Sequence, residues 1–316
     1  MLDTPSVIFI MGPTASGKTD LAVELVRRFP CDIISVDSAM VYRGMDIGTA
    51  KPGPTVLAQA PHRLIDILDP AVAYSAAQFR ADAHREIDAI HAAGRIPLLV
   101  GGTMLYFRAL QHGLSALPSA DAEVRGVIDA EARERGWAAL HQRLAQIDPA
   151  AAARIHPNDP QRIQRALEVY QLTGRPLSSF FTSQMVIPAA PALPGTLIKL
   201  VMAPSDRAVM QGRIETRFHQ MLEQGLIREV EALYQRGDLS RELPSIRSVG
   251  YRQVWDYLSD ELSYSAMIER ATSATRQLAK RQLTWLRREE EVQWFDSLQP
   301  MAFNSVIEYI EVAMKT

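Results

Sequence analysis

The chain has 316 residues, of which 47% are hydrophobic and 22% are charged, and its 34 basic and 36 acidic residues give a net charge of -2. This length and hydrophobic content allow a large core, in one large domain or in a domain with an insertion. The composition excludes a disordered chain and a globally basic nucleic-acid-binding protein, although a local basic patch remains compatible with it.

The cysteines, histidines and apolar runs exclude further classes of protein. Cys31 is the only cysteine, which excludes a disulfide framework and a multi-cysteine zinc site. The seven histidines lack the close spacing of metal ligands. The N-terminal apolar run is strand-sized and has no basic segment before it, and no apolar stretch reaches the roughly 18 residues of a membrane span. We therefore expect a cytoplasmic protein.

The first hundred residues alternate short apolar runs with amphipathic segments. The runs predict strands at 7–11, 32–36 and 96–100, and a further one at 64–68. The amphipathic segments predict helices at 18–29, 76–93 and 104–111. This alternation is typical of an α/β fold in which helices cover both faces of a parallel sheet.

The pattern changes near residue 115. Helices are predicted at 121–135, 137–146, 149–155 and 160–173, followed by an uncharged, proline-rich connector at 185–195. A strand at 197–202, helices at 206–224, 226–236 and 265–288, and an edge strand at 292–295 complete the chain. We predict an α/β core formed by 1–115 and 196–316, interrupted by a helical insertion at 116–195.

The strongest motif joins the first strand to the first helix. It follows the pattern G-x-x-x-x-G-K-[ST] and consists of Gly12, Pro13, Thr14, Ala15, Ser16, Gly17, Lys18 and Thr19. Its glycines let backbone N–H groups converge on an anion at a helix N-terminus. Lys18 adds a charge for terminal phosphate oxygens, and the Thr19 hydroxyl can bind Mg²⁺. The loop predicts a polyphosphate and Mg²⁺, but it does not decide between ATP and another diphosphate ester.

The acidic side chains are not placed as in a nucleotide hydrolase. The strand at 96–100 is followed by Gly101, Gly102 and Thr103 rather than by an acid. Asp37 instead follows the second strand, at the edge where ligands of open α/β sheets bind. Asp37 is a candidate Mg²⁺ ligand or proton acceptor, or a helix cap. Thr103 is likewise either a residue of this edge or a helix cap.

The segment 270–288 contains six basic and no acidic residues. Arg276, Lys280 and Arg287 share one helical face, and this stripe suits a phosphate backbone unless it is simply solvated. Trp285 could stack on a base or fill the core; because it lies on the opposite face, we expect it in the core. On an earlier helix, Arg213 and Arg217 are four residues apart. An arginine that reaches the phosphate loop from there would neutralise a leaving group, but spacing alone favours an exposed pair.

Seven motifs resemble, in order, those of the tRNA dimethylallyltransferase (tRNA isopentenyltransferase) family. They are GPTASGKT at 12–19, DSAMVYRGMDIGTAKP at 37–52, VGGTMLYFRAL at 100–110, NDPQRIQRALEVYQLTG at 158–174, RIETRFHQMLEQGLIREV at 213–230, SIRSVGYRQVW at 245–255 and TRQLAKRQLTWLRR at 275–288. The resemblance covers almost the whole chain.

The resemblance implies transfer of a dimethylallyl group from its diphosphate to N6 of the adenosine 3′ of the anticodon. The phosphate loop would hold the diphosphate with Mg²⁺, Asp37 would be the general base, Thr103 would lie near the amine, and Arg217 would join Lys18 on the diphosphate. The implied tRNA-contacting residues are Asp37, Ser38, Ala39, Met40, Thr103, Arg125, Gln161, Arg162, Ile163, Gln164, Arg165, Glu242, Leu243, Pro244, Ser245, Ile246, Arg247, Thr275, Arg276, Gln277, Lys280, Arg281 and Gln282.

Two features separate this chain from some of its relatives. Many members have Gln where this chain has Met40. The chain also resembles the short bacterial form, because it has no zinc-finger extension, and the resemblance favours a monomer. Two hypotheses compete with this one. The first is a kinase that phosphorylates a small metabolite, which would not need the basic helix. The second is an RNA-binding protein with an inactive phosphate loop, which the intact Lys18, Thr19 and Asp37 oppose.

Overall fold

The computed structural model describes residues 6–115, 117–181 and 193–314. The chain divides into two units, Met1–Gln111 with Leu193–Thr316, and His112–Ala192. The predicted connector at 185–195 lies mostly outside the described residues.

The first unit is built on a six-stranded sheet with the order β3-β2-β4-β1-β5-β6, and all neighbouring strands are parallel. The strands are β1 (Ser6–Met11), β2 (Cys31–Val36), β3 (His62–Arg63), β4 (Ile96–Gly101), β5 (Thr196–Ala203) and β6 (Gln293–Asp296). The predicted parallel sheet is confirmed, including the edge strand near residue 293.

Helices cover both faces of this sheet because successive side chains of each strand point to opposite faces. In β1, Ile8 and Ile10 pack toward α1 (Lys18–Arg28) and α13 (Ala302–Ala313). Val7 and Phe9 pack toward α3 (Ala76–Ala92) and α4 (Met104–His112) on the other face. The chain pattern predicts α1, α3 and α4 within a few residues, but α13 was not predicted.

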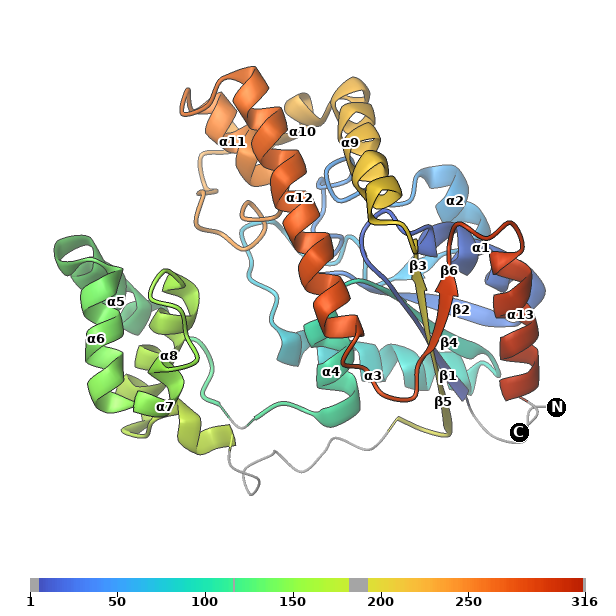
Figure 1. The fold of residues 1–316 in the computed structure, drawn as a ribbon, viewed down its shortest axis with the longest axis horizontal. Helices are drawn as coiled ribbons and strands as arrows, with labels where there is room; N and C mark the ends of the chain where they lie inside the picture. Colours follow the sequence, from blue (N-terminus) through green and yellow to red (C-terminus); the bar gives the residue numbers. More distant parts are fainter. Residues whose placement is uncertain (1–5, 116, 182–192, 315–316) are drawn as a thin grey trace. The chain divides into compact units, whose positions relative to one another are not determined.

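A further group of helices lies beyond the carboxyl ends of the strands and has its own core around Tyr251, Phe218 and Val230. Its members are α9 (Arg207–Gln224), α10 (Leu226–Tyr234), α11 (Tyr251–Leu258) and the long α12 (Tyr264–Leu286). Figure 1 shows α9 and α12 side by side, and Met210 and Ile214 of α9 pack against Ala279 of α12. A short helix, α2 (Pro54–Gln59), completes this unit.

The second unit has helical elements around its own hydrophobic core. They are α5 (Ala122–Arg135), α6 (Trp137–Ile147), α7 (Pro149–Ala152), α8 (Pro160–Thr173) and a 3₁₀ helix at Leu177–Phe181. Ile128, Leu140, Leu144, Ile163 and Leu167 are fully buried in this core. α5, α6 and α8 match their predicted bounds within one residue, whereas the helix predicted at 149–155 ends at Ala152.

The strand predicted at 64–68 is wrong. β3 is shorter and earlier, because Leu64 and Asp66 adopt left-handed backbone conformations with φ of 61° and 55°. The turn brings the carboxylate of Asp66 onto the buried ammonium of Lys51, which also bonds the carbonyl oxygen of Tyr42 at 3.0 Å. Local sequence favours a strand here, but the Lys51 contact requires a turn.

Within the described ranges, none of the helices is long and apolar enough to cross a membrane.

Candidate functional site

The carboxyl ends of β1, β2 and β4 meet at one edge of the sheet. The chain continues there as the phosphate loop after β1, as Asp37 after β2 and as Gly102–Thr103 after β4. Together with α9 and α12, these segments line a cavity of about 1100 Å³. The parallel topology thus gathers the sequence motifs that were predicted to lie at this edge.

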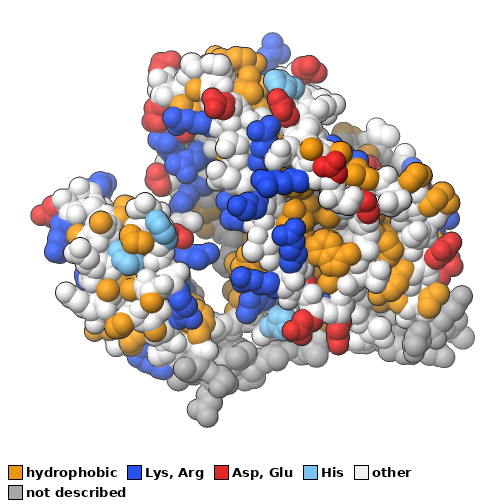
Figure 2. Space-filling view, in the orientation of Figure 1, with side chains coloured by type: hydrophobic (Ala, Val, Ile, Leu, Met, Phe, Trp, Pro, Cys, Tyr) orange, Lys and Arg blue, Asp and Glu red, His pale blue; other side chains and the backbone are white. Residues whose placement is uncertain are grey.

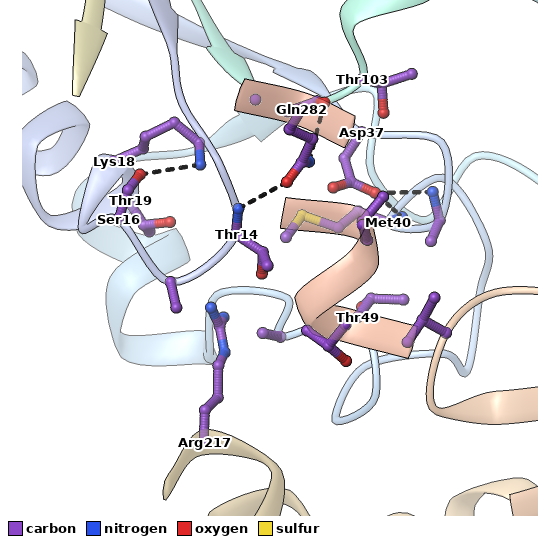
Figure 3. A pocket seen from close by; sticks show the side chains of 18 of the residues that line it. Thr14, Ser16, Lys18, Thr19, Asp37, Met40, Thr49, Thr103, Arg217 and Gln282 are labelled. Atoms are coloured by element: carbon purple, nitrogen blue, oxygen red, sulfur yellow. Dashed lines mark hydrogen bonds between the residues drawn. The ribbon is translucent and has the colours of Figure 1, made fainter. Parts of the chain in front are cut away.

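The phosphate loop has the backbone of an anion nest. Ala15 and Gly17 adopt left-handed conformations with φ of 61° and 87°, alternating with ordinary residues. Gly12 is required for space, because a Cβ there would overlap the carbonyl oxygen of Met202. The Lys18 ammonium donates to the Pro13 carbonyl at 2.6 Å and lies 3.3 Å from the Ser16 hydroxyl (Figure 3).

Two cations face this loop from different elements. Burial and the nearby guanidinium of Arg217 together lower the pKa of Lys18 to about 7, against the opposing effect of Asp37. Burial also lowers the pKa of Arg217, which Asp37 and Asp20 counteract. Figure 3 shows Arg217 extending from α9 into the cavity toward the loop. The exposed position that spacing alone favoured for Arg217 is therefore wrong, and two partly desolvated cations here make a site for an anion.

Asp37 and Thr103 both hold the turn that follows β2 at the edge of the sheet. One oxygen of Asp37, Oδ1, accepts from the N–H groups of Ala39 (2.8 Å) and Met40 (3.3 Å), so the carboxylate caps its own turn. Thr103 Oγ1 accepts from the Ser38 N–H at 3.1 Å. Asp37 therefore caps a turn and not a helix, the Thr103 hydroxyl bonds a distant loop and not a local backbone group, and both residues line the cavity.

Met40, at the position where many relatives have Gln, lies on the cavity wall, and its sulfur accepts a weak hydrogen bond from the Ser35 hydroxyl at 3.8 Å.

Trp285 is half-buried rather than enclosed in the core: it packs against the sheet, lines the cavity, and stacks under the Arg108 guanidinium at 5.8 Å.

Sequence reasoning missed Glu229 of α10, which anchors the loop at 46–48. Its carboxylate accepts from the N–H groups of Asp46 (2.9 Å), Ile47 (2.8 Å) and Gly48 (3.1 Å), and from the Tyr251 hydroxyl (2.5 Å). The loop continues along the cavity wall through Thr49. In the sequence, an acid on an amphipathic helix is indistinguishable from an exposed residue. The one signal that could have identified Glu229 is its position within the family motif at 213–230.

The basic residues of α12 divide between solvent, the cavity and a neighbouring helix. Figure 2 shows Lys and Arg side chains gathered along α12. Lys280 and Arg281 are exposed, and Arg281 also lines the cavity together with Thr275. Arg276 differs from the predicted free stripe, because its guanidinium pairs with Glu215 of α9 at 3.0 Å.

The segment 242–247 also contributes unevenly to the surface. Pro244 and Arg247 line the cavity, and Glu242 is exposed. Ser245 and Ile246 are fully buried, with the Ser245 hydroxyl donating to the Pro70 carbonyl at 2.6 Å. Their side chains hold the segment in place and do not present atoms to a ligand.

In the second unit, Arg125 and Arg165 share one buried partner. Both oxygens of Glu168, which is fully buried, bond the Arg125 guanidinium (2.8 and 3.1 Å), and Oε2 bonds Arg165 (2.7 Å). Burial alone would raise the pKa of Glu168, but these bonds outweigh it and hold the pKa below its usual value. Ile163 belongs to the core, whereas Gln161 and Arg162 are exposed.

In the described part of the chain, no cluster of three His, Cys, Asp or Glu side chains could hold a metal ion. A cation in the cavity would therefore have only single protein oxygens, such as the Thr19 hydroxyl or the Asp37 carboxylate, beside the oxygens of a bound ligand. This donor set suits Mg²⁺, which usually keeps several waters and binds few protein oxygens beside phosphates.

The fold and the cavity define a phosphate-loop α/β protein in which an anion nest lies beside an acidic side chain. A family model described as IPP transferase matches residues 40–289. A tRNA dimethylallyltransferase of Thioalkalivibrio sulfidiphilus is 67% identical over 284 residues, which are 90% of this chain and 88% of that protein. The chain therefore belongs to the IPP transferase family.

Solved structures agree with this assignment. The full-length tRNA isopentenylpyrophosphate transferase of Bacillus halodurans is 38% identical, with a TM-score of 0.71 over 98% of this chain and 97% of that chain. A tRNA delta(2)-isopentenylpyrophosphate transferase of Staphylococcus epidermidis is 32% identical, with a TM-score of 0.66 over 98% and 99%. A eukaryotic dimethylallyltransferase acting on tRNA is 26% identical, with a TM-score of 0.77 over 97% and 78%.

Proposed function

We propose that this protein transfers a dimethylallyl group from dimethylallyl diphosphate to N6 of the adenosine 3′ of the anticodon in tRNA and releases diphosphate. The observation that carries the proposal is that a cationic phosphate loop and an acidic sheet edge share one cavity. Family membership favours this reaction over phosphorylation of a small metabolite and over RNA binding without catalysis.

The donor's diphosphate belongs on the phosphate loop. When the allylic C–O bond breaks, its electron pair stays on the diphosphate, whose negative charge grows. Lys18 and Arg217 face this position, and the loop supplies backbone N–H groups. Charges that are already oriented and partly desolvated stabilise such a leaving group strongly.

The acceptor amine belongs on the Asp37 side of the cavity. The N6 lone pair forms the new C–N bond, and the amine must then lose a proton. Asp37 is the proton acceptor in this proposal: its Oδ1 is held by two backbone N–H groups, and Oδ2 lies outside those two bonds. Thr103, two residues after β4, lines the same side and would position the amine.

The adenine reaches this cavity by leaving its stack in the RNA, as expected for an enzyme that modifies a base inside a structured region. The exposed basic residues Lys280 and Arg281 would bind phosphates of the anticodon stem-loop. In the second unit, Arg125 and Arg165 would serve the same purpose, with Glu168 holding their guanidiniums in place.

Mg²⁺ is the expected cofactor. Thr19, the residue after Lys18 in the loop, supplies the protein hydroxyl, and diphosphate oxygens supply further ligands. The ion would add positive charge at the leaving group.

We also propose that the protein acts as a monomer, a point that light scattering on the purified protein tests directly.

The deciding experiment mixes purified protein, Mg²⁺, unmodified tRNA and labelled dimethylallyl diphosphate, with labelled ATP as a parallel donor. We expect label in the RNA from the prenyl donor alone. Phosphate release from ATP without prenyl transfer would instead support the kinase hypothesis.

A further inference from the structure

Gln282 of α12 joins the phosphate loop to the end of β4. Its side-chain oxygen accepts from the backbone N–H of Thr14 at 2.9 Å, and its side-chain nitrogen donates to the carbonyl oxygen of Gly102 at 3.0 Å (Figure 3). One amide thus makes two directed hydrogen bonds to two segments that both line the cavity.

Gly102 shows independently that this contact constrains the site. A Cβ at Gly102 would overlap the side-chain nitrogen of Gln282 and would lie 3.1 Å from the carbonyl oxygen of Gly12. The backbone of Gly102 does not require a left-handed conformation, so its glycine provides space rather than conformational freedom. The small residue before Thr103 is therefore explained by the amide that packs on it.

We propose that Gln282 is a positioning residue for the donor's diphosphate, a role that rests on the proposed function for the identity of the ligand. It fixes the Thr14 end of the phosphate loop on the strand end that carries Thr103. The donor and acceptor sides of the cavity are thereby held in one frame. Effective transfer depends on such a frame, because small errors in reactant placement cost large factors in rate.

This role differs from the RNA contact that the family resemblance implies for the segment at 275–282. Contact between RNA and this amide would compete with its two bonds inside the protein. Lys280, two residues earlier, is exposed, whereas Gln282 is half-buried against the loop. The same helix therefore offers one face to solvent and another to the phosphate loop.

Gln282→Met tests the proposal, because methionine keeps the length of the side chain and removes both bonds. Titration calorimetry with inorganic diphosphate and Mg²⁺ measures the donor side, and fluorescence anisotropy with unmodified tRNA measures RNA binding. We expect roughly tenfold weaker diphosphate binding, from the loss of two hydrogen bonds, and tRNA affinity within about twofold of wild type. Gln235→Met, at an exposed position after α10, should change neither.

A variant that loses tRNA affinity and keeps wild-type diphosphate affinity would overturn the positioning role and return Gln282 to the RNA. Gly102→Ala provides a second route, since it displaces the amide without changing α12 and remains informative if Gln282→Met folds poorly. We expect it to weaken diphosphate binding as well. The double variant should bind no more weakly than the worse single variant, because both act on one contact. Additive losses would contradict the proposal.

The binding assay also separates this proposal from the proposed function. If diphosphate binding by the protein depends on Gln282 but the wild-type protein transfers no prenyl group, the proposed reaction is wrong and the positioning role stands. If wild-type protein does not bind diphosphate at all, both are overturned.

Discussion

Replacing Glu229 by glutamine tests how the loop at 46–48 is held beside the cavity. Glu229 Oε2 accepts from the N–H groups of Asp46 and Ile47, and Oε1 accepts from the Gly48 N–H and the Tyr251 hydroxyl. A carboxamide has a single acceptor oxygen. If its NH₂ group faces Tyr251, it can donate to the hydroxyl oxygen, and only the Gly48 N–H loses its acceptor. In the reverse orientation the N–H groups of Asp46 and Ile47 both lose their acceptor, so the first orientation is favoured.

The expected cost follows from these bonds. The loss of one hydrogen bond to a carboxylate, with the remaining bonds now made to a neutral acceptor, should lower the free energy of unfolding by about 2 kcal/mol. For a unit of this size that corresponds to a fall in Tm of roughly 4–8 °C. The KM for dimethylallyl diphosphate should rise as well, because Gly48 and Thr49 continue the loop along the cavity wall.

Urea unfolding and thermal melting measure the effect, with Glu231→Gln as the matched control. Glu231 lies on the same helix and is exposed, so its replacement should change the free energy of unfolding by less than about 0.5 kcal/mol. If Glu229→Gln is as stable as this control, the carboxylate does not hold the loop. A Tyr251→Phe variant removes one of the four donors, and its free energy of unfolding should lie between those of Glu229→Gln and Glu231→Gln.

Four further outcomes are expected. Asp37→Asn keeps an acceptor for the turn at 39–40 but takes up no proton, so turnover should fall about 10²- to 10⁴-fold with nearly unchanged tRNA affinity in anisotropy; lost affinity with normal turnover would remove Asp37 as the base. Arg217→Ala should weaken binding of inorganic diphosphate about 10- to 100-fold in calorimetry, and an unchanged Kd would place this arginine away from the ligand. Lys280→Ala should reduce the salt dependence of tRNA binding by about one unit of slope, and an unaltered slope means that this ammonium contacts no phosphate. Burial raises the pKa of Cys31 to about 12, so a thiol-specific disulfide reagent at pH 8 should label the chain only after unfolding; labelling of native protein at the rate of a free thiol contradicts this.

The local motifs were predictable because each depends on residues close together in the chain. A strand, a glycine-rich turn and a helix in succession specify the phosphate loop, and the structure places them at 6–11, 12–17 and 18–28. Strands alternating with helices specify a parallel sheet, and parallel strands share one carboxyl edge. Asp37 and Thr103 could therefore be placed together before any contact between them was known. The resemblance to a family added the roles of these residues, which spacing alone left open.

The tertiary structure decided the contacts that cross between distant segments. Spacing alone described Arg217 as exposed, yet the packing of α9 beside the loop desolvates its guanidinium and turns it toward Lys18. The same local pattern predicted a strand at 64–68, where the demand of a buried ammonium for carboxylate partners imposes a turn. Periodicity reports only which face of an element is apolar, and it does not report which element packs on that face.

The sequence by itself therefore determined an α/β protein with a phosphate loop, an acid at the sheet edge and a basic helix at 265–288. Only the tertiary structure decided that Gln282 ties the phosphate loop to Gly102 and that Glu229 ties the loop at 46–48 to α10. Polar side chains on amphipathic helices look alike in sequence whether they meet water or a backbone N–H. The difference arises when helices pack across the carboxyl edge of the sheet, because burial makes each unpaired donor costly and so selects the side chain that accepts from it.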